Sequence, residues 1–246
     1  MHLQLDQWVI LALAAMIVGI AKTGIPGFGI VAILAVAAII PARQSTGLML
    51  PMLIAGDIFS VCYYRHHASW PHLLRLAPWA IVGVLVGACA LGRLNDTQIR
   101  PLIGGIVLAL VACNFWLKRH PEHREAFVRS HLLAAAVGVL GGLTTMIANA
   151  AGPVMVIYLL AMGLPKNAFL GTSAWFFFCV NLFKVPFSAG LGLITLSSLR
   201  FNLILLPAIL LGAWLGVRFA RRLPEKAFAI VAESLAVAGA LVLILH

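Results

Sequence analysis

The stretch Gly19-Ile-Ala-Lys-Thr-Gly-Ile-Pro-Gly-Phe-Gly29 interrupts an apolar run that extends from Trp8 to Ile40. Glycine and proline end helices, because glycine loses much backbone entropy on ordering and proline lacks an N–H donor. Inside a lipid bilayer, a broken backbone is tolerated only where protein or a water-filled cavity satisfies its polar groups. The stretch therefore predicts two helical segments that meet at a break within the protein, with Lys22 beside it.

The composition of the chain predicts an all-α polytopic membrane protein. Of its 246 residues, 63% are hydrophobic and only 10% are charged, and the mean hydropathy is +1.06. Soluble proteins contain about 45–50% apolar and about 25% charged residues. The net charge of +10 does not indicate nucleic acid as a partner, because the basic residues lie mostly in short loops between apolar runs. At those positions they would orient the chain among membrane lipids.

Ten apolar segments alternate with short polar connections. A spanning helix needs about 20 residues, so the second and seventh segments are short. Each is compatible with a re-entrant half-helix or with a short spanning helix, and the sequence does not separate these cases. The segments are 8–22, 28–40, 46–64, 73–92, 98–117, 131–148, 152–163, 168–189, 200–219 and 226–245.

The second half of the chain repeats the first. A second break, Asn149-Ala-Ala-Gly-Pro153, follows the sixth segment, as the first break follows the first segment. The pattern predicts repeats over 8–117 and 131–245, joined by a linker over 118–130. Each repeat would be a glycine-broken helical pair followed by three transmembrane helices. A shift of 124 residues aligns Pro41 with Pro165, Gly47 with Gly171 and Asp57 with Asn181, and a shift of 129 aligns Gly83 with Gly212, Gly87 with Gly216 and Arg93 with Arg222.

The charges of the loops predict that the two repeats are inverted. Suppose that the two segments at each break enter and leave the membrane on the same side. Eleven Lys and Arg residues of the loops then fall on one side of the membrane and four on the other. If each break lies within one continuous span, the split is seven against eight. Basic loop residues are concentrated on the cytoplasmic side. The inverted arrangement gives that asymmetry, with a cytoplasmic linker and both termini in the periplasm.

Lys22 is the first candidate for an anion-binding residue. A charge at membrane depth costs about 2.5–3.5 kcal/mol and needs a partner or a wet cavity. The N–H groups of a half-helix that begins near Gly27 would favour an anion beside it. The alternative is that Lys22 reaches the membrane surface from the end of its segment. Thr23, Gly24 and Gly29 belong to the same candidate site.

Three polar residues of the third and eighth segments are further candidates. Asn181 and Lys184 are three residues apart and share a helix face. Asp57, the repeat equivalent of Asn181, is a carboxylate within a predicted span. It could pair with Lys22 or Lys184, or carry a proton in a coupled cycle. A structural salt bridge without a transport role is the alternative for Asp57, and contact with lipid headgroups is the alternative for Lys184.

Neutral polar groups near the second break complete the predicted site. Asn149, Thr172 and Ser173 could bind an oxyanion through amide and hydroxyl donors, beside the half-helix that begins near Gly152. Such residues also serve as ordinary helix caps and interhelical contacts. The small-xxx-small pair Gly83 and Gly87, with its equivalent in the second half, predicts close helix packing instead of ligand contact. Such faces would also permit a homodimer.

No catalytic, metal or cofactor site is predicted. The four cysteines lie inside apolar runs, where cysteine packs as a small apolar residue. No nucleophile–base pair, zinc-ligand spacing or nucleotide-binding loop is present. The predicted function is that of a secondary transporter for a small anion. An anion channel and a membrane-embedded sulfur-handling enzyme are kept as alternatives.

The chain resembles the TauE/SafE family of sulfite exporters over about residues 8–245. The motifs that carry the resemblance are Thr23-Gly-Ile-Pro-Gly-Phe-Gly29, Arg43…Thr46-Gly47, Tyr64-Arg65-His66 before Trp70, and Leu170-Gly-Thr-Ser173…Asn181…Lys184…Gly190. Phe28 replaces a glycine that is usual in the family, and Ala150-Ala151 precedes Gly152. The resemblance implies a bacterial inner-membrane transporter for a small anion such as sulfite, thiosulfate, sulfoacetate or a related sulfonate. The sequence itself does not identify a coupling ion: a proton, a sodium ion and a passive uniporter without a coupling ion are the alternatives.

Overall fold

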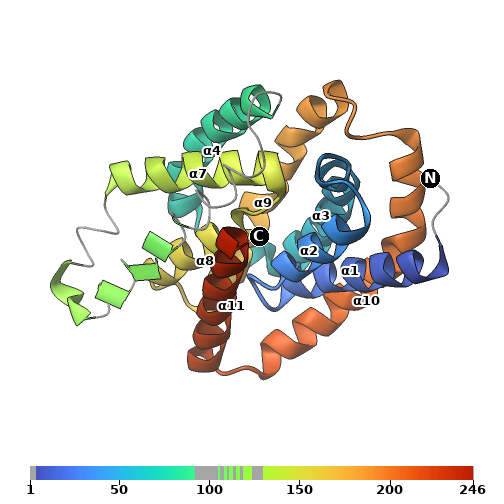
Figure 1. Ribbon diagram of the computed structural model, residues 1–246. Helices are drawn as coiled ribbons and strands as arrows, with labels where there is room; N and C mark the ends of the chain where they lie inside the picture. The colour runs from blue at the N-terminus through green and yellow to red at the C-terminus, as the bar shows by residue number, and fades with distance from the viewer. Residues whose placement is uncertain are drawn as a thin grey trace.

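The computed structural model describes residues 4–91, 105, 108–109, 111–112, 115–116, 119–123 and 130–245. All regular structure in these residues is helical, which confirms the predicted all-α class. The predicted span 98–117 and the linker 118–130 lie largely outside the described residues. Figure 1 shows the helices of the two halves interleaved in one body.

The observed helices follow the predicted segments closely. Within the described chain, six helices are long and apolar enough to cross a membrane, so the protein is a multi-pass membrane protein. These six helices are α1 (Leu5–Thr23), α3 (Ala42–Tyr64), α4 (Trp70–Ala90), α7 (His131–Ala148), α9 (Lys166–Gly190) and α10 (Leu196–Arg222). A seventh long helix, α11 (Glu225–Leu245), is not counted among them. The shorter elements are α2 (Gly29–Ile39), α8 (Ala151–Ala161), η1 (Arg65–His67) and η2 (Pro121–His123).

Helices α2 and α8 are half-helices by length. Each has 11 residues, and an α-helix rises about 1.5 Å per residue, so each is about 16 Å long. The hydrocarbon core of a bilayer is about 30 Å thick. Neither helix can cross it alone, which favours the first of the two alternatives that the sequence left open.

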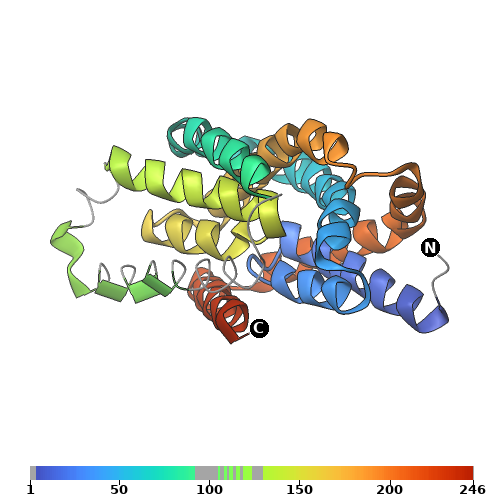
Figure 2. The same cartoon turned by 45° about the horizontal axis from the view of Figure 1, so that its top comes forward.

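Two glycine-lined interfaces join the halves. A Cβ added at Gly212 of α10 would lie 2.0 Å from the Met16 carbonyl oxygen of α1, and one at Gly83 of α4 would lie 2.1 Å from the Val139 carbonyl oxygen of α7. The backbones therefore touch, as the small-xxx-small pattern predicts. Helices α1 and α4 of the first half of the chain thus pack on α10 and α7 of the second half. Figures 1 and 2 show α1 along α10 and α4 along α7.

Helices α3 and α9, which the 124-residue shift aligns, pack against each other in opposite directions. Near the end of α3, a Cβ at Gly171 of α9 would meet the Tyr64 carbonyl oxygen, and near its start Gly47 meets Leu193, just beyond α9. Between these contacts, Asn181 Nδ2 donates to Asp57 Oδ2 over 2.7 Å. These two residues are the ones that the 124-residue shift aligns. The shift therefore aligns two residues that contact each other directly.

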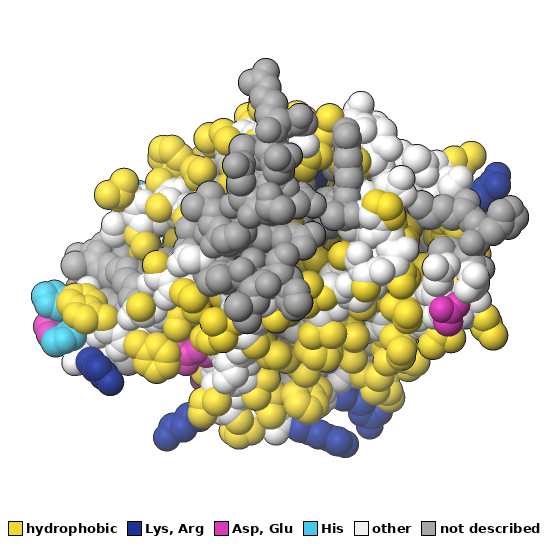
Figure 3. Space-filling model, viewed as in Figure 1, with side chains coloured by type: hydrophobic (Ala, Val, Ile, Leu, Met, Phe, Trp, Pro, Cys, Tyr) yellow, Lys and Arg dark blue, Asp and Glu magenta, His cyan; other side chains and the backbone are white. Residues whose placement is uncertain are grey.

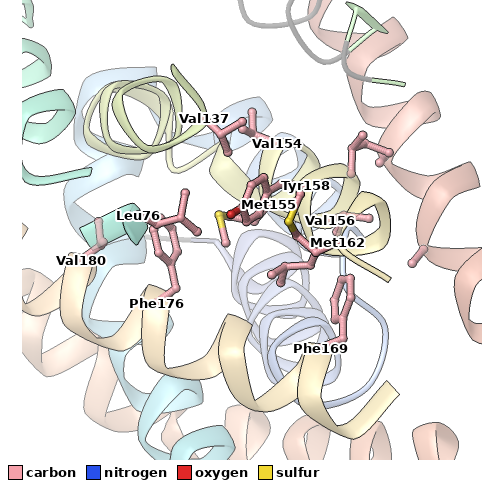
Figure 4. Close-up of a cluster of buried hydrophobic side chains, with 14 of the residues drawn as sticks. Leu76, Val137, Val154, Met155, Val156, Tyr158, Met162, Phe169, Phe176 and Val180 are labelled. Atoms are coloured by element: carbon pink, nitrogen blue, oxygen red, sulfur yellow. The ribbon is translucent and has the colours of Figure 1, made fainter. Parts of the chain in front are cut away.

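The largest apolar cluster surrounds α8. Nine of its side chains are buried, including Met155, Ile157 and Tyr158. Figure 4 shows Met155 and Tyr158 among Val137 of α7 and Phe169 and Phe176 of α9. In lipid this contact is stabilised by close packing more than by the hydrophobic effect, because lipid tails are themselves apolar. The cluster fixes α8, and with it the second break, in the interior.

Basic side chains gather at one end of the molecule. The end of α3, the start of α9 and the end of α10 line one pocket there. Lys166 Nζ donates to the carbonyl oxygens of Ala220 and Leu223 over 2.8 and 2.7 Å and so joins α9 to α10. Arg65, Arg221 and Arg222 are exposed near this junction. Figure 3 shows several Lys and Arg side chains along the lower edge, below a surface rich in hydrophobic groups.

Candidate functional site

The first break is built by the glycine and proline residues that follow Lys22. Helix α1 ends at Thr23, and the backbone N–H of Gly24 still donates to the Ile20 carbonyl. Pro26 then supplies no N–H. Gly27 has φ of +90°, a conformation that side-chain-bearing residues rarely adopt. Helix α2 starts two residues later, at Gly29, and no side chain caps it.

Two side chains of α3 satisfy the carbonyl groups that the first break leaves free. Ser60 Oγ donates to the carbonyl oxygen of Lys22 over 2.8 Å. The Tyr64 hydroxyl donates to the carbonyl oxygen of Thr23 over 2.9 Å. The last carbonyls of a helix have no intrahelical donors, and water is scarce in lipid. Helix α3 therefore holds the end of α1 in place and fixes the position of Lys22.

The second break depends on Asn149 and Pro153. Asn149 has φ of +54° and caps α7 in the left-handed conformation, which asparagine tolerates better than most residues. Helix α8 starts at Ala151. Pro153 lies in its first turn, where an N–H would have no intrahelical acceptor. The Asn149 side chain is also held, because its Nδ2 donates to the Thr46 carbonyl oxygen over 3.1 Å.

A continuous chain of polar contacts connects the two breaks. Lys22 Nζ lies 2.7 Å from Asp57 Oδ1, and the other carboxylate oxygen accepts from Asn181 Nδ2 over 2.7 Å. Lys184 Nζ donates to Asn181 Oδ1 over 3.3 Å and to Asn149 Oδ1 over 2.6 Å. Asp57, Asn181 and Lys184 are fully buried. The chain thus holds two ammonium groups and one carboxylate, with a net charge of one positive unit when all three are ionised.

A small cavity of about 70 Å³ lies beside this chain. A water molecule needs roughly 10–15 Å³ of such space, so the cavity can hold on the order of five water-sized groups. Its polar lining consists of the side chains of Lys22, Asp57, Thr145, Asn149, Ser173 and Asn181; its remaining lining is apolar or glycine and includes Pro26, Gly27 and Gly29 of the first break and Gly152 and Pro153 of the second.

The structure places four of the predicted site residues away from the cavity lining. Thr23 Oγ1 donates to the Ala213 carbonyl oxygen of α10 over 2.7 Å, and Gly24 is pressed against Gly216. Thr172 Oγ1 accepts from the backbone N–H of Ser69 and donates to the Ala168 carbonyl oxygen. Lys184 lies behind Asn149 and Asn181. The first three residues join helices, and Lys184 holds the second break.

Two cavity residues that contact a lysine of the polar chain were not among the predicted site residues. Thr145 Oγ1 accepts from Lys184 Nζ over 3.1 Å, and it lies one helical turn before Asn149, a spacing that would have placed it on the same face. The ring of Phe177 lies 4.2 Å from Lys22 Nζ, where a cation–π contact is favourable. No signal in the sequence singles out Phe177 among the neighbouring aromatic residues of α9.

The arrangement suits an anion better than a metal ion. Lys22, at the cavity wall, is a cation whose partners are a carboxylate and an aromatic face. The neutral amide and hydroxyl groups of Asn149 and Ser173 can donate to oxygen atoms without adding charge. Within the part of the chain that the structure describes, no group of three His, Cys, Asp or Glu side chains could hold a metal ion.

Comparison with known proteins identifies the family. The family model described as "Sulfite exporter TauE/SafE" matches residues 11–243, nearly the whole chain. No curated protein and no solved structure is detectably similar. The match covers both breaks, the polar chain between them and the cavity. The chain therefore belongs to the TauE/SafE family of sulfite exporters, a family of membrane transporters and not of enzymes.

Proposed function

We propose that the protein is a secondary transporter that moves a small sulfur-containing anion across the bacterial inner membrane by alternating access. The substrate class is that of sulfite, thiosulfate, sulfoacetate or a similar sulfonate. The cavity between the breaks is the substrate site. Lys22 supplies the charge, and Asn149, Ser173 and Asn181 supply neutral donors.

The observation that carries this proposal is the meeting of both breaks at one small polar cavity. Broken helices that meet near the middle of a repeat interface form the substrate sites of many secondary transporters. The first turns of α2 and α8 lie at the lining, through Gly29 and Gly152. The first N–H groups of a helix have no acceptor within that helix, and helix N-termini favour negative charge. In α2, the N–H groups of Ile30 and Val31 donate to the carbonyl oxygens of Gly27 and Phe28 in the break, so the N-terminal contribution of α2 comes from its first residue, Gly29.

The packing of α3 and α9 supports inverted repeats. These helices are equivalent in sequence and run in opposite directions. Two repeats with the same membrane orientation would place equivalent spanning helices parallel to each other. The exposed basic residues at the junction of α3, α9 and α10 support a cytoplasmic location for that end. We infer from this orientation that both termini are periplasmic.

The test is a flux measurement with purified protein in liposomes. Sulfite, thiosulfate, sulfoacetate, taurine, sulfate and acetate are offered in turn, and exchange for the same labelled anion inside is followed. A transporter gives exchange that saturates with concentration, whereas an anion channel gives flux that continues to rise and follows the membrane potential. Absence of exchange for every sulfur-containing anion would overturn the substrate assignment.

A further inference from the structure

We propose that Asp57 is the proton-binding group that couples anion binding to proton movement, by holding or releasing Lys22. This inference rests on the proposed function, since it concerns the same cavity. It assigns the coupling ion, which that function leaves open between a proton and a sodium ion. It also explains why an anion-binding cavity contains a carboxylate.

The contacts of Asp57 show that its carboxylate occupies the position of an anionic ligand. One oxygen lies 2.7 Å from the Lys22 ammonium, and the other accepts from the Asn181 amide over 2.7 Å. Lys22 and Asn181 both line the cavity. A bound oxyanion would need these same donors. The ionised carboxylate is therefore an internal competitor of the substrate.

The charges around Asp57 decide what its protonation does. Helix α1 brings Lys22, and α9 brings Lys184, which reaches Asp57 through Asn181. Cys179 of α9 is a further titratable group near the carboxylate. Helix α7 contributes the neutral groups of Thr145 and Asn149. When Asp57 is ionised, one of the two positive charges is already neutralised at 2.7 Å.

Protonation releases that charge. A hydronium ion in the aqueous phase transfers its proton to the Asp57 carboxylate, which gives a neutral acid and a water molecule, and no other bond in the protein changes. The Lys22 ammonium, still protonated, then pairs with the incoming anion. The anion and the proton enter the cavity together, and deprotonation of Asp57 restores the internal ion pair and expels the anion. A sodium ion has no comparable place, because the only carboxylate at the described cavity already contacts an ammonium group.

The experiment measures anion binding and proton uptake together. Thiosulfate is titrated into weakly buffered, detergent-purified protein with a pH-sensitive dye, between about pH 6 and pH 8. The variants are Asp57→Asn, which resembles the protonated acid in shape, and Asp57→Glu, which keeps a titrating group. Asp6→Asn, an exposed acidic residue on the first turn of α1, is the matched control.

We expect the wild type and the control to take up about one proton for each thiosulfate bound. Their apparent Kd should rise about tenfold for each pH unit, because the bound form holds one more proton than the free form. Asp57→Asn should bind thiosulfate with no proton uptake and with a Kd independent of pH. Asp57→Glu should restore the uptake.

Three results would overturn the proposal. Thiosulfate binding to the wild type without proton uptake leaves the anion site intact and removes the proton from the mechanism. Uptake that persists in Asp57→Asn but disappears in Lys184→Met places the proton on Lys184. If the wild type binds none of thiosulfate, sulfite or sulfoacetate, the anion site itself is wrong and the coupling role of Asp57 falls with it.

Discussion

Substitution of Gly212 by alanine tests the interface that holds the first break. A Cβ on Gly212 would lie 2.0 Å from the Met16 carbonyl oxygen, and ordinary contact begins at 3.4 Å. The two backbones must therefore separate by about 1.4 Å along this contact. Overpacking of this kind costs about 1–3 kcal/mol. Alanine in a helix interior is intrinsically favoured over glycine by about 0.5–1 kcal/mol, so the clash outweighs the propensity.

The overlap is with backbone atoms, so the upper end of the overpacking range, about 3 kcal/mol, applies, and the net expected loss is about 2–2.5 kcal/mol. For a chain of this size, such a loss lowers the melting temperature by roughly 4–10 °C. Thermal unfolding in detergent, followed by intrinsic tryptophan fluorescence, measures the change. Gly141→Ala in α7 is the matched control, because its Cβ would meet only the Phe176 ring at 3.6 Å.

The control should melt at or slightly above the wild-type temperature. The thiosulfate affinity of Gly212→Ala should also fall, because α10 holds the end of α1 through the Thr23 hydroxyl and the Ala213 carbonyl. If Gly212→Ala is as stable as Gly141→Ala, the backbone contact between α1 and α10 is not formed as described, and the position of Lys22 loses its explanation.

Three further predictions concern the cavity and its surroundings. Tyr64→Phe should lower the free energy of unfolding by about 1–3 kcal/mol, because the buried Thr23 carbonyl loses its donor; Tyr63→Phe, at the exposed neighbouring position, should have no measurable effect in the same melting assay. Ser173→Ala should weaken thiosulfate binding about 2- to 10-fold through one lost hydrogen bond, whereas Thr172→Val should lower the stability and leave the thiosulfate affinity unchanged. Calorimetry measures the affinity and thermal melts measure the stability. Equal losses of affinity in the two variants would contradict the placement of Thr172 away from the cavity. Replacement of Cys62, Cys89, Cys113 and Cys179 by alanine should leave thiosulfate exchange in liposomes within about twofold, and its abolition would support a sulfur-handling thiol.

The helices and the breaks could be predicted from the sequence because they depend on local properties. Glycine and proline at the first break, and the apolar lengths on both sides, are sufficient to locate α1 and α2. A repeat was predicted partly because Asp57 and Asn181 stand out among apolar neighbours. Lys22 and Lys184 became candidates for the site for the same reason, because each is a polar residue within an apolar segment.

The directions in which side chains point could not be predicted, because they depend on contacts between distant segments. Thr23 follows Lys22 directly, yet it faces α10, since its acceptor is 190 residues away. Thr172 and Ser173 are also adjacent, and only Ser173 lines the cavity. Near a broken helix, the last turn can rotate to suit its neighbours, so spacing alone does not fix which side faces the cavity.

The partner of Asp57 likewise could not be predicted from the sequence alone. The sequence allowed pairing with Lys22 or with Lys184. The structure gives Lys22 the direct contact at 2.7 Å and places Lys184 one residue further along the polar chain, behind Asn181. The result depends on where the end of α1 is held against α3, and Ser60 and Tyr64 of α3 make that contact.

The most direct test of the anion site is the thiosulfate-dependent melting temperature of wild type and Lys22 variants. A ligand that binds only the folded protein stabilises it by RT ln(1 + [L]/Kd). Lys22→Gln removes the cation, and the double variant Lys22→Gln/Asp57→Asn also removes the carboxylate that would be left unpaired. Arg200→Gln, at an exposed cation on α10, is the control. We predict stabilisation of the wild type and the control, and none in either Lys22 variant at the same thiosulfate concentration. Full stabilisation of the folded double variant would contradict the claim that Lys22 binds the anion.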